Sequence, residues 1–380
     1  MRVINYPLKN FFSYFRKKGF EVLVLRGYEK LPYVYGGDLD IEVRFSQFES
    51  FIKELFTFSK EEGLHLTKYI YRPHVSSFKF YRLKDNIVER FILDITCRGG
   101  IWFGMAYLTN QELFEKSFDT GLWRVPCKLH EIILKIFTNM LIGNKPPKKY
   151  FNEISIQLPS IKDEFVEFIS QRFPGIDALH LYKSLVEGNS EELFCFIPLL
   201  KKALVKRTLF GSVDEAIKAM RLLLETILAE VYFYTQYNGT KLYLVYSDEL
   251  DWLKFIELLK KNCGHIWKNV ILWHESGKKQ NCLFNKILEK TELFRDRLIV
   301  VPVRTRYSKS GSVSFQNENV VRIGDIPQRI LYDELTSDIT LRLYRYLEKR
   351  NKRRNQMWIY SNVLWRFFGY KNTFKIYSEI

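Results

Sequence analysis

The sequence predicts an α/β protein with three sections: an N-terminal mixed sheet with helices, a helical middle section and a C-terminal α/β doubly wound domain. Three observations predict this order. Apolar residues in the first hundred positions recur mostly at a spacing of two, which is typical of strands. Between residues 150 and 235 they recur at spacings of three and four, which is typical of helices. Beyond residue 238, apolar runs alternate with helical patterns, and such alternation favours a parallel sheet.

Length and composition agree with several folded domains. With 380 residues the chain is long enough for two or three domains, and we expect boundaries that give 1–145, 146–236 and 237–380. Apolar residues make up 47% of the chain and aromatic residues 16%. No apolar run reaches about 18 residues and the N-terminus lacks the pattern of a signal peptide, so neither a membrane span nor a signal peptide is predicted.

The segment 21–44 is the most informative part of the N-terminal section. Residues 22–25 form an apolar, β-branched run, and the glycines and proline after it predict a turn region. Leu39, Ile41 and Val43 then alternate with polar residues, which indicates a half-buried strand. Residues 1–20 predict an amphipathic helix whose apolar side carries Phe11, Phe12, Tyr14 and Phe15.

The same reasoning assigns the remaining elements in chain order. In the N-terminal section we expect helices over 46–59 and 129–141, strands over 64–71, 76–83 and 88–96, and a hairpin turn at 84–86. In the middle section we expect helices over 165–173, 176–186, 191–205 and 213–234, punctuated by Pro174, Pro198 and Gly211. In the C-terminal section we expect strands over 241–246, 270–273 and 298–303, helices over 249–261, 284–294 and 330–352, and a loop over 304–319.

Three acidic residues are the candidates for chemistry: Asp38, Asp40 and Asp94. Asp38 and Asp40 are two residues apart in a strand pattern, so they project to one side, roughly 7 Å apart. Asp94 lies near the end of a strand that can pair beside theirs. Carboxylates held together repel one another unless a cation lies between them, and their oxygens suit Mg²⁺ or Mn²⁺. We expect all three to be metal ligands, with Asp94 binding the metal that activates an acceptor hydroxyl or acting as its base.

Residues near these acids are candidates for phosphate contacts. Two glycines directly before Asp38 let the backbone come close to a ligand. Lys79 alternates with Phe78 and Phe80 in a nearby strand, so it projects away from their apolar face. The nucleotide-binding residues expected from this reasoning are Arg26, Gly36, Gly37 and Lys79, with Arg82 and Arg98 as further cations for phosphate.

Taken in order, these features resemble the nucleotidyltransferase fold of the DNA polymerase β superfamily. They are a strand, Gly27-Tyr28, nine residues, Asp38-Leu39-Asp40 in an apolar strand, and Asp94 on a later strand. Within that superfamily, LRGYEKLP followed by GGDLDIEV is similar to minimal nucleotidyltransferase-like proteins of bacterial surface-polysaccharide clusters. The resemblance covers about residues 20–145. It implies a metal-dependent transferase that moves a nucleotidyl group from an NTP to a sugar, polyol or glycan acceptor. It also adds Gly27 and Tyr28 to the expected nucleotide-binding residues.

One position departs from the family pattern. The family often has Ser or Gly after the first glycine, where a small residue contacts phosphate, and Tyr28 occupies that position here. Two interpretations stay open: Gly36 and Gly37 provide the approach to phosphate, or the nucleotide lies differently.

The C-terminal section has a fainter resemblance. In some proteins of the same clusters, a region similar to thymidylate kinases follows the nucleotidyltransferase-like region. Here no GxxxxGK[ST] loop follows the strand over 241–246, so the phosphate cradle and its lysine are missing. The resemblance implies a degenerate P-loop-kinase-like domain that binds an acceptor or serves as a scaffold.

The net charge of +16 favours anionic partners. Basic residues cluster at 145–149 and 342–354, and an aromatic segment follows at 357–370. A basic and aromatic segment suits an anionic membrane surface, which predicts a cytoplasmic protein bound peripherally at the inner face of the membrane. The alternative is a C-terminal helix docked on the core.

Two other functions stay open. One is a nucleic-acid-binding or RNA-modifying protein of the same fold, which the charge and the 23 tyrosines favour. The other is a non-catalytic scaffold in polysaccharide assembly with a relic nucleotide site.

Cysteines and histidines give no further site. The five cysteines are scattered and form no CxxC pair, which argues against a zinc site or a disulfide framework and favours a reducing cytoplasm. His74, His130, His265 and His274 have no metal-ligand spacing, so we expect ordinary buried or surface histidines.

Overall fold

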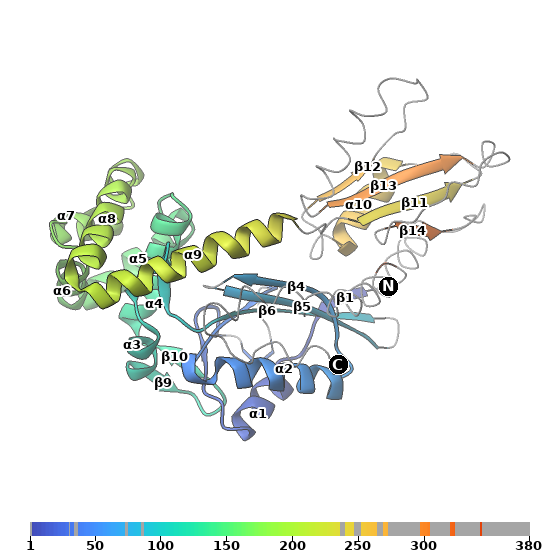
Figure 1. Ribbon diagram of the computed structural model, residues 1–380, viewed down its shortest axis with the longest axis horizontal. Helices are drawn as coiled ribbons and strands as arrows, with labels where there is room; N and C mark the ends of the chain where they lie inside the picture. The colour runs from blue at the N-terminus through green and yellow to red at the C-terminus, as the bar shows by residue number, and fades with distance from the viewer. Residues whose placement is uncertain are drawn as a thin grey trace, which may run out of the picture.

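The computed structural model describes residues 2–29, 31–33, 37–72, 75–84, 87–235, 240–246, 252–263, 269–272, 297–304, 320–323 and 343. This described part is mixed α/β, as predicted, with an eight-stranded mixed sheet, a run of helices and a four-stranded sheet (Figure 1). Several predicted features lie outside the described residues: Gly36, His74, His265, His274, residues 85–86 of the hairpin turn, the helix over 284–294, the loop beyond Arg304, the helix over 330–352 apart from Leu343, and the segment 357–370.

The eight-stranded sheet contains the strands predicted in the N-terminal section and several that were not. Its order is β4-β5-β6-β3-β2-β10-β9, with β1 beside β6. β3 and β6 are parallel neighbours, while β5 and β6 form an antiparallel hairpin as predicted. The strands are β1 Arg2–Asn5, β2 Val22–Val24, β3 Leu39–Val43, β4 His65–Arg72, β5 Val75–Lys84, β6 Ile87–Thr96, β9 Ser117–Asp119 and β10 Arg124–Pro126.

The prediction of one helix over 1–20 is wrong at its start. Arg2–Asn5 form β1, and the helix α1 spans only Lys9–Lys17. The reason is the length of β6: β3 pairs with its last part, from Leu93, and leaves the edge of its first part open. β1 pairs with that part, from Ile87 to Arg90, which removes an exposed strand edge.

One face of this sheet is covered by α1 and by α2, which spans Phe48–Glu61 (Figure 1). The core between them is strongly aromatic, since Phe11, Phe15, Phe51, Phe58 and Phe91 are all essentially buried. The Phe15 and Phe51 rings stack with their centroids 4.3 Å apart. Much of the unusual aromatic content therefore packs this layer, where each ring buries a large apolar surface.

The opposite face of the sheet carries the polar residues of the strand patterns. Leu39 and Ile41 of β3, with Leu93 and Ile95 of β6, point to the aromatic core. The residues between them point the other way because side chains alternate along a strand. The long helix α9, Val213–Thr235, runs across this opposite side and contacts β4 (Figure 1).

The middle of the chain is helical, as predicted. A second core extends from the hairpin of β7 and β8 through α4 to α8. Its elements are β7 Gly100–Trp102, β8 Met105–Leu108, α3 Asn110–Glu115, α4 Lys128–Phe137 with the π-helical turn η2 Thr138–Ile142, α5 Phe151–Gln157, α6 Lys162–Arg172, α7 Ala178–Glu187 and α8 Ser190–Gly211.

Pro198 lies inside α8, as it lies inside the predicted helix over 191–205. A proline removes one helical hydrogen bond and leaves a carbonyl of the preceding turn without a partner. The helix surface around it is exposed, with Phe194 and Leu199 each 50% accessible. Water can therefore reach this part of the helix, which lowers the cost of the unpaired carbonyl.

Gly104, in the turn between β7 and β8, allows this hairpin to pack closely against α9. Its φ is +83°, and a Cβ there would lie 2.3 Å from the backbone oxygen of Ala219. We expect Gly104→Ala to lower the free energy of unfolding by more than about 2 kcal/mol, because the left-handed conformation alone costs roughly 1–2 kcal/mol and the backbone clash adds to it. Urea unfolding followed by circular dichroism measures this loss.

The matched control for Gly104 is Gly19, whose φ is +81° and whose Cβ would meet nothing within 4 Å. Gly19→Ala should show the conformational cost alone. Equal losses for the two variants would contradict a close contact between the hairpin and α9.

His130, on α4, is buried in the second core, with 3% of its surface exposed and Nδ1 without a hydrogen-bond partner. Burial lowers the pKa of His130 to about 4, from an ordinary value near 6.5. Between these values the unfolded chain binds a proton that the folded protein does not, so stability falls as pH is lowered from 6.5 to 4. We expect a loss on the order of 3 kcal/mol, absent in His130→Leu and measured by urea unfolding from pH 4.5 to 8.

The matched control for His130 is His180, an exposed histidine near the start of α7. His180→Leu should keep the pH dependence of the parent protein. If His130→Leu keeps it too, burial of His130 does not set the acid sensitivity.

The C-terminal section contains a parallel sheet, in agreement with its strand and helix alternation. The order is β12-β13-β11-β14, and every pair is parallel. The fourth strand was not predicted. The elements are β11 Thr240–Tyr246, α10 Trp252–Cys263, β12 Asn269–Leu272, β13 Arg297–Arg304 and β14 Val320–Ile323. None of the helices formed by the described residues combines the length and the apolar character needed to cross a bilayer.

Candidate functional site

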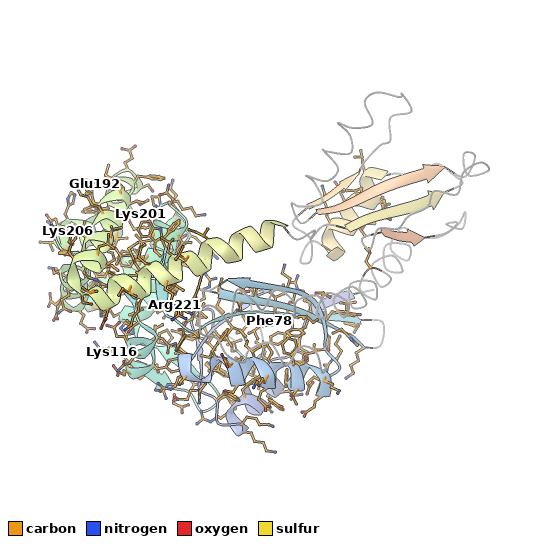
Figure 2. The ribbon with its side chains drawn as sticks, in the orientation of Figure 1. Phe78, Lys116, Glu192, Lys201, Lys206 and Arg221 are labelled. Carbon is orange, nitrogen blue, oxygen red and sulfur yellow. The ribbon has the colours of Figure 1, made fainter. Side chains whose placement is uncertain are left out.

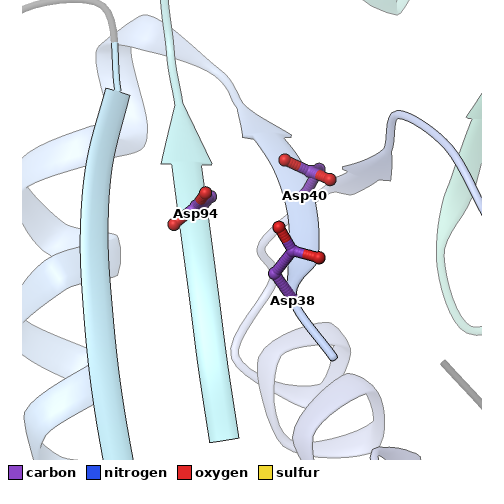
Figure 3. A group of neighbouring side chains, drawn as sticks. All are labelled: Asp38, Asp40 and Asp94. Atoms are coloured by element: carbon purple, nitrogen blue, oxygen red, sulfur yellow. The ribbon is translucent and has the colours of Figure 1, made fainter. Parts of the chain in front are cut away.

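The three predicted acids meet on the face of the eight-stranded sheet that points away from α1 and α2. Asp40 on β3 lies directly opposite Asp94 on the parallel strand β6, and Asp38 immediately precedes β3. Each offers a carboxylate oxygen, and these oxygens lie within 4.8 Å of one another. Figure 3 shows the three carboxylates on neighbouring strands, directed to one side of the sheet. The apolar residues between them fix this arrangement, because they are buried on the other face.

The electrostatics of this acidic cluster favour an added positive charge. Burial, the largest influence, raises the pKa of both Asp40 and Asp94, and the charge of Asp38 raises both further. One carboxylate oxygen of Asp94, Oδ1, is buried and accepts no hydrogen bond. Three converging carboxylates and an unpartnered buried oxygen are the donor set that Mg²⁺ or Mn²⁺ uses, so the residues present fit such an ion.

Arg26 contacts the acidic cluster directly. Its Nε donates to Asp40 Oδ2 at 2.6 Å, and its Nη1 donates to the Tyr150 hydroxyl at 3.4 Å. The Arg26 side chain is 44% exposed and the Asp40 side chain 17% exposed. The charge of Lys149 also lowers the pKa of Asp40, against the larger effect of burial. The short helix η3, Lys148–Tyr150, therefore brings the basic run 145–149 to the acids.

Tyr28 lies in a hydrogen-bonded network with α4. Its hydroxyl donates to Glu131 Oε2 at 2.5 Å, and Lys135 Nζ donates to Glu131 Oε1 at 2.5 Å. Lys135 also forms an ion pair with Glu153. The Tyr28 side chain is half-buried and packs against the aromatic core. The residue that departs from the family pattern thus ties the turn after β2 to the helical section.

The described glycines of the turn have different surroundings. Gly27 has φ +67°, and a Cβ there would meet nothing within 4 Å. Its conformation, and not a close neighbour, therefore favours glycine. Gly37 has φ +124°, and its Cβ would lie 3.6 Å from Arg90 Nη2.

The predicted cations differ in their distance from the cluster. Lys79 is half-buried on β5, and its charge slightly lowers the pKa of Asp94, which burial raises. Arg82 lies elsewhere, in ion pairs with Glu62 at 2.9 Å and Glu89 at 2.6 Å. Arg98 pairs with Glu225 of α9 at 3.3 Å, beyond the end of β6. Arg82 is therefore an internal ion-pair residue and not part of the cluster.

Residues near the cluster that the sequence did not single out include Ser77, Lys149, Tyr150 and Glu42. Ser77 on β5 lies opposite Asp94, and its side chain forms a hydrogen bond that lowers the pKa of Asp94 against burial. Because side chains alternate along a strand, Ser77 lies on the same face as Lys79, and the sequence pattern could have identified it. Tyr150 gave no such signal, because it lies more than a hundred residues from Arg26 in sequence.

Glu42 lies two residues beyond Asp40 on the same strand face and is completely buried. Burial raises its pKa to about 7, although it accepts hydrogen bonds from Thr96, Asn110 and the Gly99 amide. The hydrogen bond from Gly99 is 2.7 Å long and that from Asn110 is 2.5 Å long. Glu42 thus joins the ends of β3 and β6 to the start of α3.

Comparison with models of protein families, with curated proteins and with solved structures gave no match to this chain.

Proposed function

We propose that this protein is a metal-dependent nucleotidyltransferase that moves a nucleotidyl group from an NTP to a hydroxyl or phosphate of a small molecule or glycan. The observation that supports the proposal is the convergence of Asp38, Asp40 and Asp94 within 4.8 Å on two parallel strands. The unpartnered, buried Asp94 Oδ1 supports it further. An arrangement of this kind suits positioning and charge neutralisation more than covalent catalysis.

Within this proposal, each acid has a role set by its position. Asp38 is exposed and Asp40 half-buried, so this pair holds the metal ion at the open side, where the NTP phosphates approach. Asp94 lies across from Asp40 on β6 and binds the metal that activates the acceptor hydroxyl, or accepts the proton of that hydroxyl as pyrophosphate leaves the NTP. When bound, Mg²⁺ or Mn²⁺ would neutralise phosphate charge and polarise the reacting phosphoryl group.

The cations around the cluster complete the proposed site. Arg26 is exposed enough to exchange Asp40 for a phosphate oxygen, which the planar guanidinium binds well. Lys149 adds positive charge near Asp40. Bacterial surface-polysaccharide biosynthesis is the setting that the resemblance implies, with sugar, polyol or glycan acceptors.

A thermal-shift screen of all NTPs and nucleotide sugars, each with Mg²⁺, Mn²⁺ or EDTA, tests this proposal. We expect at least one NTP to raise the melting temperature only when the metal is present, since a ligand at a hundred times its Kd stabilises a protein by about 2.7 kcal/mol. If no NTP gives a metal-dependent shift while oligonucleotides bind with a steep salt dependence, the nucleic-acid function replaces it.

A further inference from the structure

A pocket of about 830 Å³ lies beyond the ends of β3 and β6, between the β-sheet section and the helices α8 and α9. None of the three acids of the metal cluster lines it. Its apolar wall includes Phe45, Phe48, Ile101 and Leu222. Pockets of 300–1,000 Å³ hold small organic molecules, so this one is too large for a single inorganic ion.

The lining is predominantly basic. Five cationic side chains and three acidic ones line the pocket, namely Arg98, Arg172, Arg207, Lys218 and Arg221 against Glu49, Glu215 and Glu225. Arg98 and Arg221 share Glu225, each at 3.3 Å, and the Glu225 side chain is only 1% exposed. These two cations are therefore already balanced in part by a buried carboxylate.

A third cation, Arg172, pairs with Glu112, whereas Arg207 differs from these three. Its Nη2 donates to the Ala106 carbonyl oxygen at 2.6 Å, but its Nη1 is buried without a hydrogen-bond partner. Among the residues that the structure describes, it forms no ion pair. The next residue, Thr208, is 4% exposed, and its Oγ1 also lacks a partner. Two adjacent polar groups on the wall of one pocket are thus left without partners.

A buried donor without a hydrogen-bond partner is costly, and a half-buried cation that lacks a direct ion pair adds to the cost. Burial, followed by the charge of the neighbouring Arg172, lowers the pKa of Arg207, against the smaller effects of the Glu215 and Glu112 charges. An anion in the pocket would offset both effects, because it would accept from the guanidinium and from the Thr208 hydroxyl.

We propose that this pocket binds a small organic phosphate ester, whose phosphate accepts hydrogen bonds from Arg207 Nη1 and Thr208 Oγ1. The exposed Lys218 adds positive charge around it, and the organic body occupies the volume next to Phe45 and Leu222. This site is separate from the metal cluster and does not rest on the proposed nucleotidyl transfer.

Binding of glucose 6-phosphate, with inorganic phosphate and glucose as comparison probes, tests this site by titration calorimetry. EDTA is present throughout, so that a metal at the acidic cluster does not contribute. We expect the parent protein to bind glucose 6-phosphate and not glucose. Arg207→Met should weaken binding of the ester by about ten- to a hundredfold, the loss expected for a hydrogen bond to a charged group.

The control variant is Lys206→Met, which removes the same charge from the exposed neighbour of Arg207 on α8. Figure 2 labels Lys206 at the outer side of the helical section, and this variant should bind as the parent does. Should Arg207→Met fail to fold, Thr208→Val and the exposed Lys218→Gln should each weaken binding instead.

Three results would overturn the proposal. The first is no binding of glucose 6-phosphate at about 10 mM, a concentration at which even a weak millimolar site would be mostly filled. The second is equal binding by the parent protein and Arg207→Met. The third is inorganic phosphate binding as tightly as the ester, which would leave the organic body without a role. Because the assay contains no free metal, each of these results leaves the proposed transferase activity to its own test.

Discussion

Asp40→Asn is expected to abolish metal binding at the acidic cluster and, with it, metal-dependent transfer. The carboxylates of Asp38, Asp40 and Asp94 lie within 4.8 Å of one another, and Asp40 is directly opposite Asp94, so its loss removes one of three ligands. Replacing residues that only support a metal ligand typically costs 10–100-fold in affinity or activity. Loss of a ligand itself should therefore exceed about a hundredfold. Mn²⁺ binding, followed by the electron paramagnetic resonance signal of free Mn²⁺, measures it without knowledge of the substrate.

The fold of Asp40→Asn should be intact, because burial already disfavours the charge of this carboxyl. Its ion pair with Arg26 involves a side chain that is 44% exposed, so losing it costs little stability. The matched control is Asp119→Asn, which removes the same charge from an exposed pair with Arg16. Unchanged Mn²⁺ affinity in Asp40→Asn, or an equal loss in both variants, would contradict the metal site.

The acids of this cluster could be predicted from sequence because their signal is local. Alternation in β3 places Asp40 and Glu42 opposite the apolar residues, and the same alternation in β6 places Asp94. The sequence indicated that β3 and β6 can pair, but their parallel register, with Asp40 opposite Asp94, is known only from the structure. The residues around these acids were harder to predict. Tyr150, for example, accepts a hydrogen bond from Arg26, although the two are more than a hundred residues apart in sequence.

The long elements of the fold were predicted, while several of the short ones were not. α2, α8 and α9 have fourteen or more residues each, enough for apolar residues to recur several times at helical spacing. In contrast, β9, β10 and β7 have three residues each, too few for a period to be recognised. β1 was assigned to a helix because its four residues precede an amphipathic run and their pairing partner lies more than eighty residues away.

The large pocket beside α9 could not be predicted either, because its residues are distant in sequence. Its cations come from Arg98, Arg172, Arg207 and two residues of α9, which no sequence pattern groups together. Arg98 alone was a candidate for phosphate, and its pairing with Glu225 places it at this pocket and not at the acidic cluster. Unpaired polar atoms such as Arg207 Nη1 become visible only once the packing is known.

Lys135→Met is expected to lower the free energy of unfolding by about 3–5 kcal/mol, the cost of leaving a buried charge without its partner. The Lys135 and Glu131 side chains are 7% and 6% exposed, and Lys135 Nζ lies 2.5 Å from Glu131 Oε1. Without the lysine, Glu131 keeps the hydrogen bond from Tyr28 but loses its cation. Urea unfolding at neutral pH measures the loss. The control Lys128→Met changes an exposed lysine of the same helix and should stay within about 0.5 kcal/mol.

The double variant Lys135→Met with Glu131→Gln separates the two roles of this network. It leaves no buried charge, so most of the lost stability should return, while a glutamine can still accept from the Tyr28 hydroxyl. If the Tyr28 link holds the turn with Gly27 in place, the double variant should also keep the Mn²⁺ affinity of the parent. A double variant that regains stability but binds Mn²⁺ more weakly than the parent would mean that the charges of Glu131 and Lys135 themselves act on the acidic cluster. A Lys135→Met loss no larger than that of Lys128→Met would mean that the pair is solvated and does not brace Tyr28.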